Sequence, residues 1–147
     1  MYQRILVATD RSRLSRKAEK AAIGLAAATG ATLVVLHVVP DYPTSYFEGA
    51  VTLAPEEIAR IENHWTAQGQ STVNAVVSAA GKAGVQARGV LAHSDKVAEA
   101  VMAAARKHKC DLIAMASHGR RGITRVLLGS ETQHVLTHSK IPVLVLR

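Results

Sequence analysis

The fold is decided by the stretch Leu112-Ile113-Ala114-Met115-Ala116-Ser117-His118-Gly119, which leads through Gly122 to Gly129-Ser130-Glu131. Its first five residues are apolar without interruption, which is typical of a parallel strand that is buried on both faces. Serine followed by glutamate is a common helix start. A buried strand, a glycine-containing connection and a helix in this order predict an α/β protein.

The rest of the chain repeats this alternation. Three further segments are short and continuously apolar: Ile5–Thr9, Thr32–Val38 and Val143–Leu146. A fifth segment, Val85–Leu91, alternates more between apolar and polar residues and is predicted to lie at a sheet edge. These patterns predict five strands in one parallel sheet.

Helices are predicted between the strands. The first is capped by Ser12 or Ser15 and runs to about Ala28, with Gly30 after its end. The others begin at Pro55, after Ser94-Asp95 and at Ser130-Glu131, and the second ends at Gly81 or Gly84. The order predicts one Rossmann-like domain over residues 1–147. Its open sheet has strand order 3-2-1-4-5 and helices on both faces.

Composition narrows the classes of function. The chain has 147 residues and a formal net charge of +7, which favours anionic partners. Only 3% of residues are aromatic, which argues against a nucleic-acid surface. No apolar run is long enough for a membrane span, and no secretory signal is visible at Met1. The single cysteine, Cys110, fits a packed thiol in a reducing compartment, so a cytoplasmic location is expected.

The glycine-containing segment is a candidate phosphate site. A helix start offers unpaired N–H groups and a positive dipole end, and glycine lets an anion approach the backbone. Gly129 and Ser130 stand at such a start, while Arg120 and Arg121 add positive charge. The alternative is that the glycines only form turns and Ser130 only caps the helix. The spacing is neither that of a P-loop nor Gly-x-Gly-x-x-Gly.

A second part of the site is expected at the end of the first strand. Open α/β sheets bind ligands where the strand order reverses, which places Thr9-Asp10 and Ser117-His118-Gly119 at one crevice. Asp10 would repel a phosphate, so it is expected to bond a ribose or base or to hold a metal. Its alternative role is a cap for the first helix.

These residues together resemble the universal stress protein family. The resemblance rests on Ile5–Asp10, Leu36-His37-Val38, Ser117–Gly122, Leu128-Gly129-Ser130 and Ile141–Val145. The family's ATP-binding branch has the pattern Gly-x2-Gly-x9-Gly-Ser/Thr. Here Gly119 and Gly129-Ser130 match that pattern, while Ala116 replaces its first glycine. Arg11 stands where the family often has glycine, and its side chain is expected to face solvent.

The resemblance implies a fold similar to the adenine nucleotide alpha hydrolase fold. It also implies that the chain is a regulatory module that binds ATP, with Mg²⁺, and has little or no turnover. The residues that it assigns to the nucleotide are Ala8, Thr9 and Asp10 at the adenosine, the Val38 backbone at the adenine edge, Met115 and Ala116 beneath it, Ser117, His118, Gly119 and Arg120 along the ribose and phosphates, and Gly129, Ser130 and Glu131 at the phosphate tail. The family also commonly forms homodimers through the last strand.

Other functions stay open at this point. No catalytic residue is assigned, but Asp10 and Glu131 are carboxylates near the predicted phosphates, so a slow ATPase is an alternative. Ala116 favours a second alternative, a nucleotide-free relative that acts by contacting an unknown protein partner. His134 and His138 have a spacing that can bind zinc, although histidines on a helix surface usually bind none. Nucleic-acid binding is the weakest alternative, supported only by the basic charge.

Overall fold

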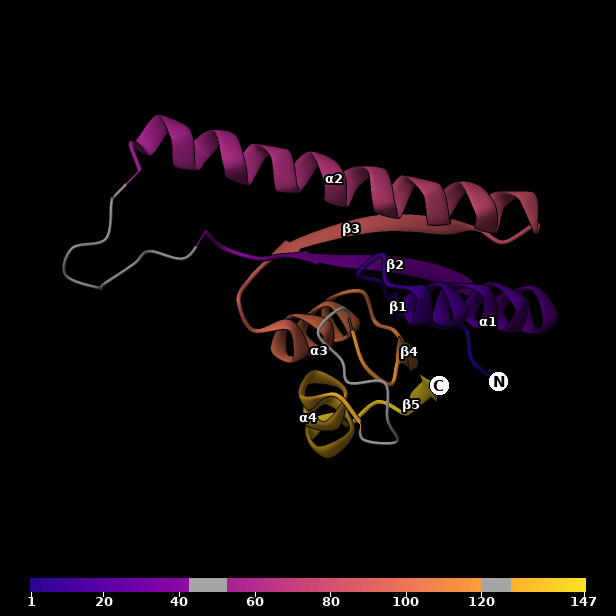
Figure 1. The fold of residues 1–147 in the computed structure, drawn as a ribbon. Coiled ribbons are helices and arrows are strands. Elements are labelled where there is room, and N and C mark those ends of the chain that lie inside the picture. Colours follow the sequence, from indigo (N-terminus) through magenta and orange to yellow (C-terminus); the bar gives the residue numbers. More distant parts are fainter. Residues whose placement is uncertain (43–52, 120–127) are drawn as a thin grey trace.

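The apolar segments form one five-stranded sheet. A computed structural model describes residues 1–42, 53–119 and 128–147. The strands are β1 (Arg4–Ala8), β2 (Thr32–Val39), β3 (Ala87–His93), β4 (Leu112–Ala116) and β5 (Val143–Leu146). All neighbouring strands are parallel, and their order is β3-β2-β1-β4-β5 (Figure 1). The predicted fold class and strand order are confirmed.

The helices begin and end close to the predicted signals. They are α1 (Arg13–Thr29), α2 (Pro55–Lys82), α3 (Val97–Lys107) and α4 (Ser130–His138). The Ser12 hydroxyl caps α1 by accepting a hydrogen bond from the Ser15 N–H at 3.1 Å. Gly30 ends the same helix with φ of 72°, a left-handed conformation that favours glycine. Pro55 occupies the first turn of α2, as its fixed φ allows.

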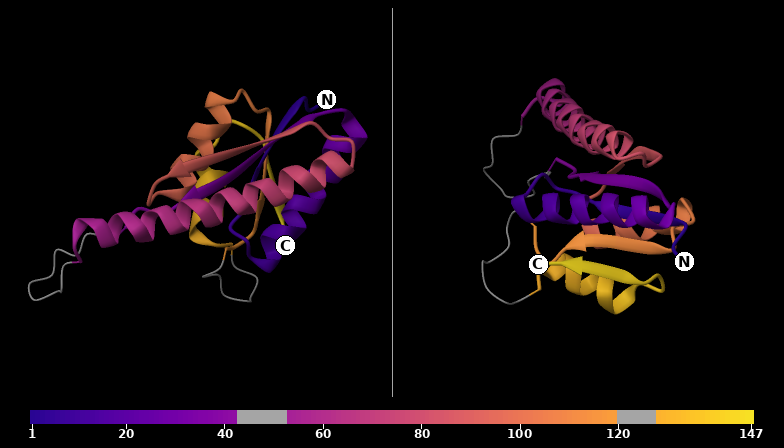
Figure 2. Two further views of the ribbon diagram at one scale, coloured as in Figure 1. Left: turned by 90° about the horizontal axis from the view of Figure 1, so that it is seen from above. Right: turned by 90° about the vertical axis from the view of Figure 1, so that its right-hand side faces the viewer.

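Two helices cover each face of the sheet (Figure 2). Ile5 and Val7 of β1 pack with α1 and α2, whereas Leu6 between them packs with α3 and α4. All three side chains are fully buried. Because successive strand residues point to opposite faces, a strand covered on both sides needs apolar residues at every position. This is the physical cause of the uninterrupted apolar runs.

The third strand differs from its prediction by two residues. Val85 is buried but precedes β3, and its N–H donates to the carbonyl of Ala80 in the last turns of α2. The strand then continues to His93 instead of ending at Leu91. Its position at the sheet edge is confirmed, because only β2 pairs with it. The predicted segment is therefore an edge strand, but its first residue, Val85, belongs to the connection that follows α2.

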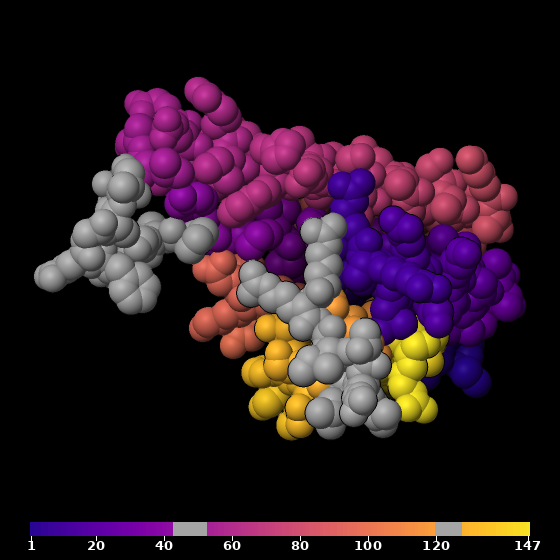
Figure 3. Space-filling model, viewed as in Figure 1, coloured from indigo at the N-terminus to yellow at the C-terminus, as the bar shows by residue number. Residues whose placement is uncertain are grey.

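Helix α2 is much longer than the strand that it covers. Its 28 residues span about 42 Å, whereas the seven residues of β3 span about 23 Å. The first half of α2 projects beyond the sheet, and the helix runs along one side of the molecular surface (Figures 2 and 3). Trp65 on this half stacks with Tyr42, with ring centroids 6.1 Å apart. None of the helices in the described ranges has the length and apolar character needed to span a membrane.

Cys110 lies just before β4 and is a packing residue. It is 6% exposed and belongs to the core between the sheet and α3. Burial raises the pKa of its thiol to about 11, with the Arg4 charge lowering it and Asp111 raising it. A thiol with so high a pKa carries little of the reactive thiolate at neutral pH. The interpretation of a packed thiol is consistent with this environment.

Arg11 gives the first testable prediction. It is exposed to solvent, as expected, and has φ of 68°. A non-glycine residue in this region costs about 1–2 kcal/mol, and glycine gives back about 0.5–1 kcal/mol in chain entropy. We expect Arg11→Gly to raise the free energy of unfolding by about 0.5–1 kcal/mol, measured by urea unfolding. Lys20→Gly in the middle of α1 should have the opposite effect, and a loss of stability in both variants would contradict the argument.

Candidate functional site

The candidate site lies at the carboxyl ends of β1 and β4. These strands are neighbours, with Val7 beside Ala114, and the chain leaves them toward opposite sides of the sheet. Such a reversal of strand order leaves a crevice that no crossover helix covers. The residues that follow the two strands, Thr9-Asp10 and Ser117-His118-Gly119, therefore start at the same edge.

Asp10 and Gly119 are in direct proximity. A Cβ atom placed on Gly119 would lie 2.5 Å from Oδ2 of Asp10, so a larger residue cannot occupy this position without a shift. The other oxygen of Asp10 accepts a hydrogen bond from the N–H of Ser12 at 2.9 Å. Gly119 does not have a positive φ, so it is the close approach of the Asp10 carboxylate that favours glycine at this position.

Gly129 packs on the same loop from the other side. Its N–H donates to the carbonyl of Ser117 at 2.7 Å. A Cβ atom on Gly129 would lie 3.1 Å from the Cα of His118 and 3.3 Å from the Ser117 carbonyl oxygen. The N–H of Gly129, which was assigned to the phosphate tail, is thus used inside the protein. Asp10, His118, Gly119 and Gly129 therefore lie close together, and we call the edge region that these four residues form the crevice.

The start of α4 borders the crevice. Gly129 is the N-cap residue and has no side chain that could cap the first turn. Ser130 is exposed. The carboxylate of Glu131 is used elsewhere, because it accepts a hydrogen bond from the N–H of Ala98 at 2.7 Å and so caps α3. Since that carboxylate is held at α3, the first turn of α4 presents backbone N–H groups and the Ser130 hydroxyl.

A buried hydrogen bond that the sequence analysis missed fixes α4 against β4. The hydroxyl of Thr132 donates to the carbonyl of Ala116 at 2.8 Å, and Thr132 is 2% exposed. Met115 and Ala116 are buried beneath the crevice, at 6% and 8% exposure. Little of the Ala116 methyl group is therefore exposed where the family pattern has glycine. The available signal for Thr132 was its place three residues before Val135, on the same face of the predicted helix.

A second polar cluster lies beneath Thr9. The Thr9 side chain is buried, lies 3.2 Å from the Ser15 hydroxyl and donates a hydrogen bond to Glu19. Its carbonyl is 2.9 Å from Nδ1 of His37. Burial raises the pKa of Glu19, the nearby Asp10 charge raises it further, and the Thr9 hydrogen bond and Arg16 lower it. The sequence analysis assigned Thr9 to the adenosine and did not identify this support from α1.

Val38 lies near the end of β2, beside the crevice. Backbone groups of alternate strand residues point to the same neighbouring strand. The Leu36 carbonyl accepts from the N–H of Thr9 at 2.9 Å, so the backbone of Val38 points to the same side, beyond the end of β1. Ala8 ends β1 and is half-buried. These positions are compatible with adenine recognition by the Val38 backbone.

Other predicted residues lie apart from this arrangement. Arg120, with Arg121 and Arg125, falls outside the described residues. His134 and His138 are exposed on α4, with ring centroids 4.3 Å apart, and Nδ1 of His138 is 3.0 Å from the His134 carbonyl. Within the described ranges no three or more metal-binding side chains come together. The Ser117 hydroxyl is 3.2 Å from Nδ1 of His118, which gives that histidine a local hydrogen-bond partner.

The raised pKa of Glu19 gives a prediction on pH and stability. A group whose pKa is raised by folding stabilises most below its ordinary value of 4.5, and this contribution is lost as the pH rises through the folded value. We expect Glu19→Gln to be more stable than the parent protein at pH 7 and equally stable near pH 4, as measured by thermal unfolding. Glu56→Gln at the exposed start of α2 should be slightly less stable at pH 7. A Glu19→Gln variant that is less stable than the parent protein at pH 7 would contradict the raised pKa of Glu19.

Comparison with known proteins finds one consistent group. The model of the "Universal stress protein family" matches residues 1–147. The chain is 32% identical over 149 residues to universal stress protein YxiE of Bacillus subtilis, with 100% of both chains covered. It is 25% identical to the solved protein MJ0577, with a TM-score of 0.82 and coverage of 99% and 96%.

Similar solved structures include complexes with cAMP, dAMP and AMP. A universal stress protein in complex with cAMP is 26% identical, with a TM-score of 0.69 and coverage of 99% of this chain and 97% of that one. A family protein from Arabidopsis thaliana with AMP bound has a TM-score of 0.69 at 15% identity, covering 97% and 90%. The second likeness extends to the fold alone.

Proposed function

Because this chain belongs to the universal stress protein family, we propose that it binds an adenine nucleotide in the crevice, with ATP as the preferred nucleotide. The observation that carries the proposal is the pair of glycines at the crevice. At Gly119 and Gly129 a Cβ atom would meet Asp10 and His118, so these glycines let the ends of β1 and β4 and the start of α4 pack closely together, where phosphates would bind. The cAMP complex of a similar protein supports an adenine nucleotide as the ligand.

The roles of the residues follow from the contacts. Backbone N–H groups in the first turn of α4 and the Ser130 hydroxyl would hold the phosphate tail, since the N-cap residue Gly129 has no side chain to cap that turn. The Ser130 hydroxyl would help to hold Mg²⁺, which would supply positive charge against the phosphates when bound. Val38 would bond the adenine edge through its backbone. Thr9, held by Ser15 and Glu19, would shape the adenosine end.

The two carboxylates nearest the phosphates favour a regulator over an enzyme. An ATPase needs a residue that positions the attacking water. Asp10 accepts the N–H of Ser12, and Glu131 accepts the N–H of Ala98, so both carboxylates are engaged in structural bonds. We therefore expect turnover far below the usual range of about 1–1000 per second. A slow ATPase is the second candidate function, and turnover above about one per minute would favour it.

The proposal extends to assembly and place of action. β5 is an edge strand, and its Leu144 is 36% exposed. Exposed apolar edge strands are usually covered, so a homodimer through β5 is part of the proposal. The protein would act in the cytoplasm by contacting a partner protein in a nucleotide-dependent way. Light scattering with and without ATP tests the dimer.

The decisive experiment measures nucleotide in and on the protein. Mass spectrometry of small molecules released from freshly purified, denatured protein should detect an adenine nucleotide. Thermal unfolding should then shift upward with ATP and Mg²⁺, because a ligand of the native state stabilises it by about 2.7 kcal/mol at a hundred times its Kd. Titrations with cAMP, AMP and GTP give the order of preference. No shift with any adenine nucleotide at millimolar concentration would favour the nucleotide-free alternative.

A further inference from the structure

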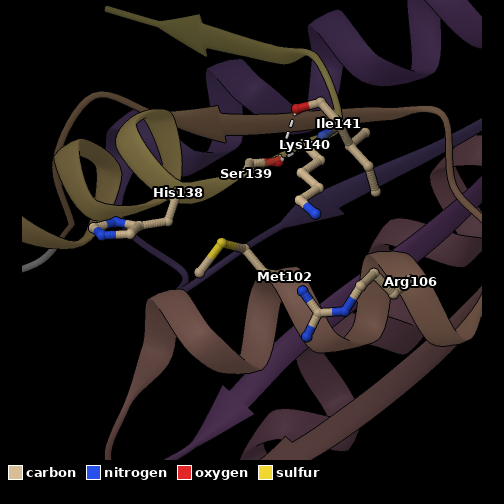
Figure 4. A pocket seen from close by; sticks show the side chains of 6 residues that line it. All are labelled: Met102, Arg106, His138, Ser139, Lys140 and Ile141. Carbon is tan, nitrogen blue, oxygen red and sulfur yellow. Dashed lines mark hydrogen bonds between the residues drawn. The ribbon is translucent and has the colours of Figure 1, made fainter.

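A pocket of about 310 Å³ lies between α3 and the segment that follows α4. Figure 4 shows the side chains that line it: Met102, Arg106, His138, Ser139, Lys140 and Ile141. Its volume lies at the lower end of the range of small-molecule sites, which is about 300–1,000 Å³. The pocket is therefore large enough for a small metabolite.

The pocket is separate from the crevice. Ser139, Lys140 and Ile141 directly precede β5, and Arg106 lies in the last turn of α3, just before β4. These positions are at the amino ends of the strands, whereas the crevice lies at their carboxyl ends. In a parallel sheet the two edges are opposite. A ligand in this pocket would not occupy the nucleotide site.

Uncompensated positive charge marks the pocket. The guanidinium of Arg106 and the amine of Lys140 come from different segments and extend into the same space (Figure 4). None of the described residues that line the pocket is a carboxylate. Over the described part of the chain the one ion pair joins Lys96 to Glu99, so neither Arg106 nor Lys140 belongs to a salt bridge there. Both side chains are exposed, so water screens the repulsion between them, and a bound anion would be attracted to both charges.

Helix ends explain only part of this charge. Cations in the last turn of a helix offset the negative dipole end, which accounts for Arg106 in α3 and His138 in α4. Lys140 lies beyond the end of α4, and its amine extends toward Arg106 (Figure 4). The hydroxyl of Ser139 is already bonded to the backbone of Ile141 in both directions, at 2.8 and 3.0 Å. Arg106 and Lys140 are thus the groups with donors to offer.

We propose that this pocket binds the phosphate group of a small phosphorylated metabolite. An arginine fork fits two phosphate oxygens, and a lysine amine adds a third charge-assisted contact. Met102 and Ile141 provide an apolar wall for the carbon skeleton, which bare inorganic phosphate would not need. The ligand class is accordingly a phosphomonoester.

The test is a titration of the full-length protein in which two-dimensional NMR monitors the backbone amides. Glycerol 3-phosphate is added at constant ionic strength, in the presence of saturating adenine nucleotide. We expect shifts at the amides of Arg106, Ser139, Lys140 and Ile141. The double variant Arg106→Gln/Lys140→Met should bind at least about tenfold more weakly, because it loses charge-assisted hydrogen bonds. Its nucleotide binding should stay unchanged.

The matched control removes the same charge elsewhere. Arg60→Gln/Lys82→Met alters two cations of α2 and should bind glycerol 3-phosphate like the parent protein. The proposal is overturned if sodium chloride at equal ionic strength gives the same shifts, or if both double variants lose binding equally. It is also overturned if a phosphoserine peptide binds through these residues and glycerol 3-phosphate does not. Inorganic phosphate should bind more weakly than the ester.

Discussion

Gly129→Val is expected to abolish nucleotide binding while the protein still folds. Gly129 has φ of −60° and ψ of 152°, which a valine can adopt, so the backbone itself does not oppose the change. The new side chain would meet the Cα of His118 at 3.1 Å and the carbonyl oxygen of Ser117 at 3.3 Å. Relief of these contacts must move the start of α4 away from the loop that follows β4.

The expected size of the effect follows from the phosphate contacts. Two backbone hydrogen bonds to a charged group are worth about 1.5–3 kcal/mol each, so affinity should fall by at least about a hundredfold. The strain should lower the free energy of unfolding by about 1–3 kcal/mol. Isothermal titration calorimetry with ATP and Mg²⁺ measures the first effect, and urea unfolding measures the second.

Gly24→Val is the matched control. Gly24 lies in α1 and has no atom within 4 Å of its Cβ position, so valine there meets nothing. We expect nearly parental stability and unchanged ATP binding. If Gly129→Val binds ATP like this control, the nucleotide does not lie on the first turn of α4. Loss of binding in both variants would point to a general effect on folding.

Thr132→Val is expected to lower the free energy of unfolding by about 1–3 kcal/mol. Valine has nearly the shape of threonine, so packing is kept while the 2.8 Å hydrogen bond to the Ala116 carbonyl is lost. That carbonyl would lose the buried donor at the end of β4. The melting temperature should fall by roughly 2–4 °C for each kcal/mol in a domain of this size. ATP affinity should also fall, since this bond fixes the start of α4.

The same helix provides the control. Thr137 of α4 also donates to a carbonyl, that of Gln133 at 2.8 Å, but it is exposed. Thr137→Val should change stability by less than about 0.5 kcal/mol. Equal losses of stability in the two variants would mean that the buried hydrogen bond of Thr132 has no special role. An unchanged ATP affinity in Thr132→Val would mean that this bond stabilises the fold but does not position the nucleotide site.

The fold could be predicted because its signals are local and consistent. The strands that lie inside the sheet are covered on both faces, so their sequences are apolar throughout, as in Leu112–Ala116. Ser12, Gly30 and Pro55 act within one helix turn, and the structure uses each as expected. The predicted start of β3 was two residues too early. Val85 is buried like a strand residue, but its N–H donates to the carbonyl of Ala80 at the end of α2 and not to a neighbouring strand.

The candidate site was predictable in its position and less so in its contacts. Strand order alone brings Asp10 and Gly119 together at one edge. The partners of Glu131 and Thr132 depend on how α3 and α4 pack, and no local pattern encodes the bond from Glu131 to Ala98. Glu19 is a similar case, because its hydrogen-bond partner Thr9 lies at the end of β1 and is set by how α1 packs on the sheet.

Helix α4 begins at one ligand region and ends at the other. Its nine residues rise about 13 Å, from the cap at Gly129 to His138 at the wall of the α3–α4 pocket. A rod this short transmits a tilt of one end to the other with little bending. An anion bound at the carboxyl end of α4 would therefore change the orientation of its amino end, and with it the affinity for the nucleotide. By thermodynamic linkage, the nucleotide would change the affinity for the anion by the same factor.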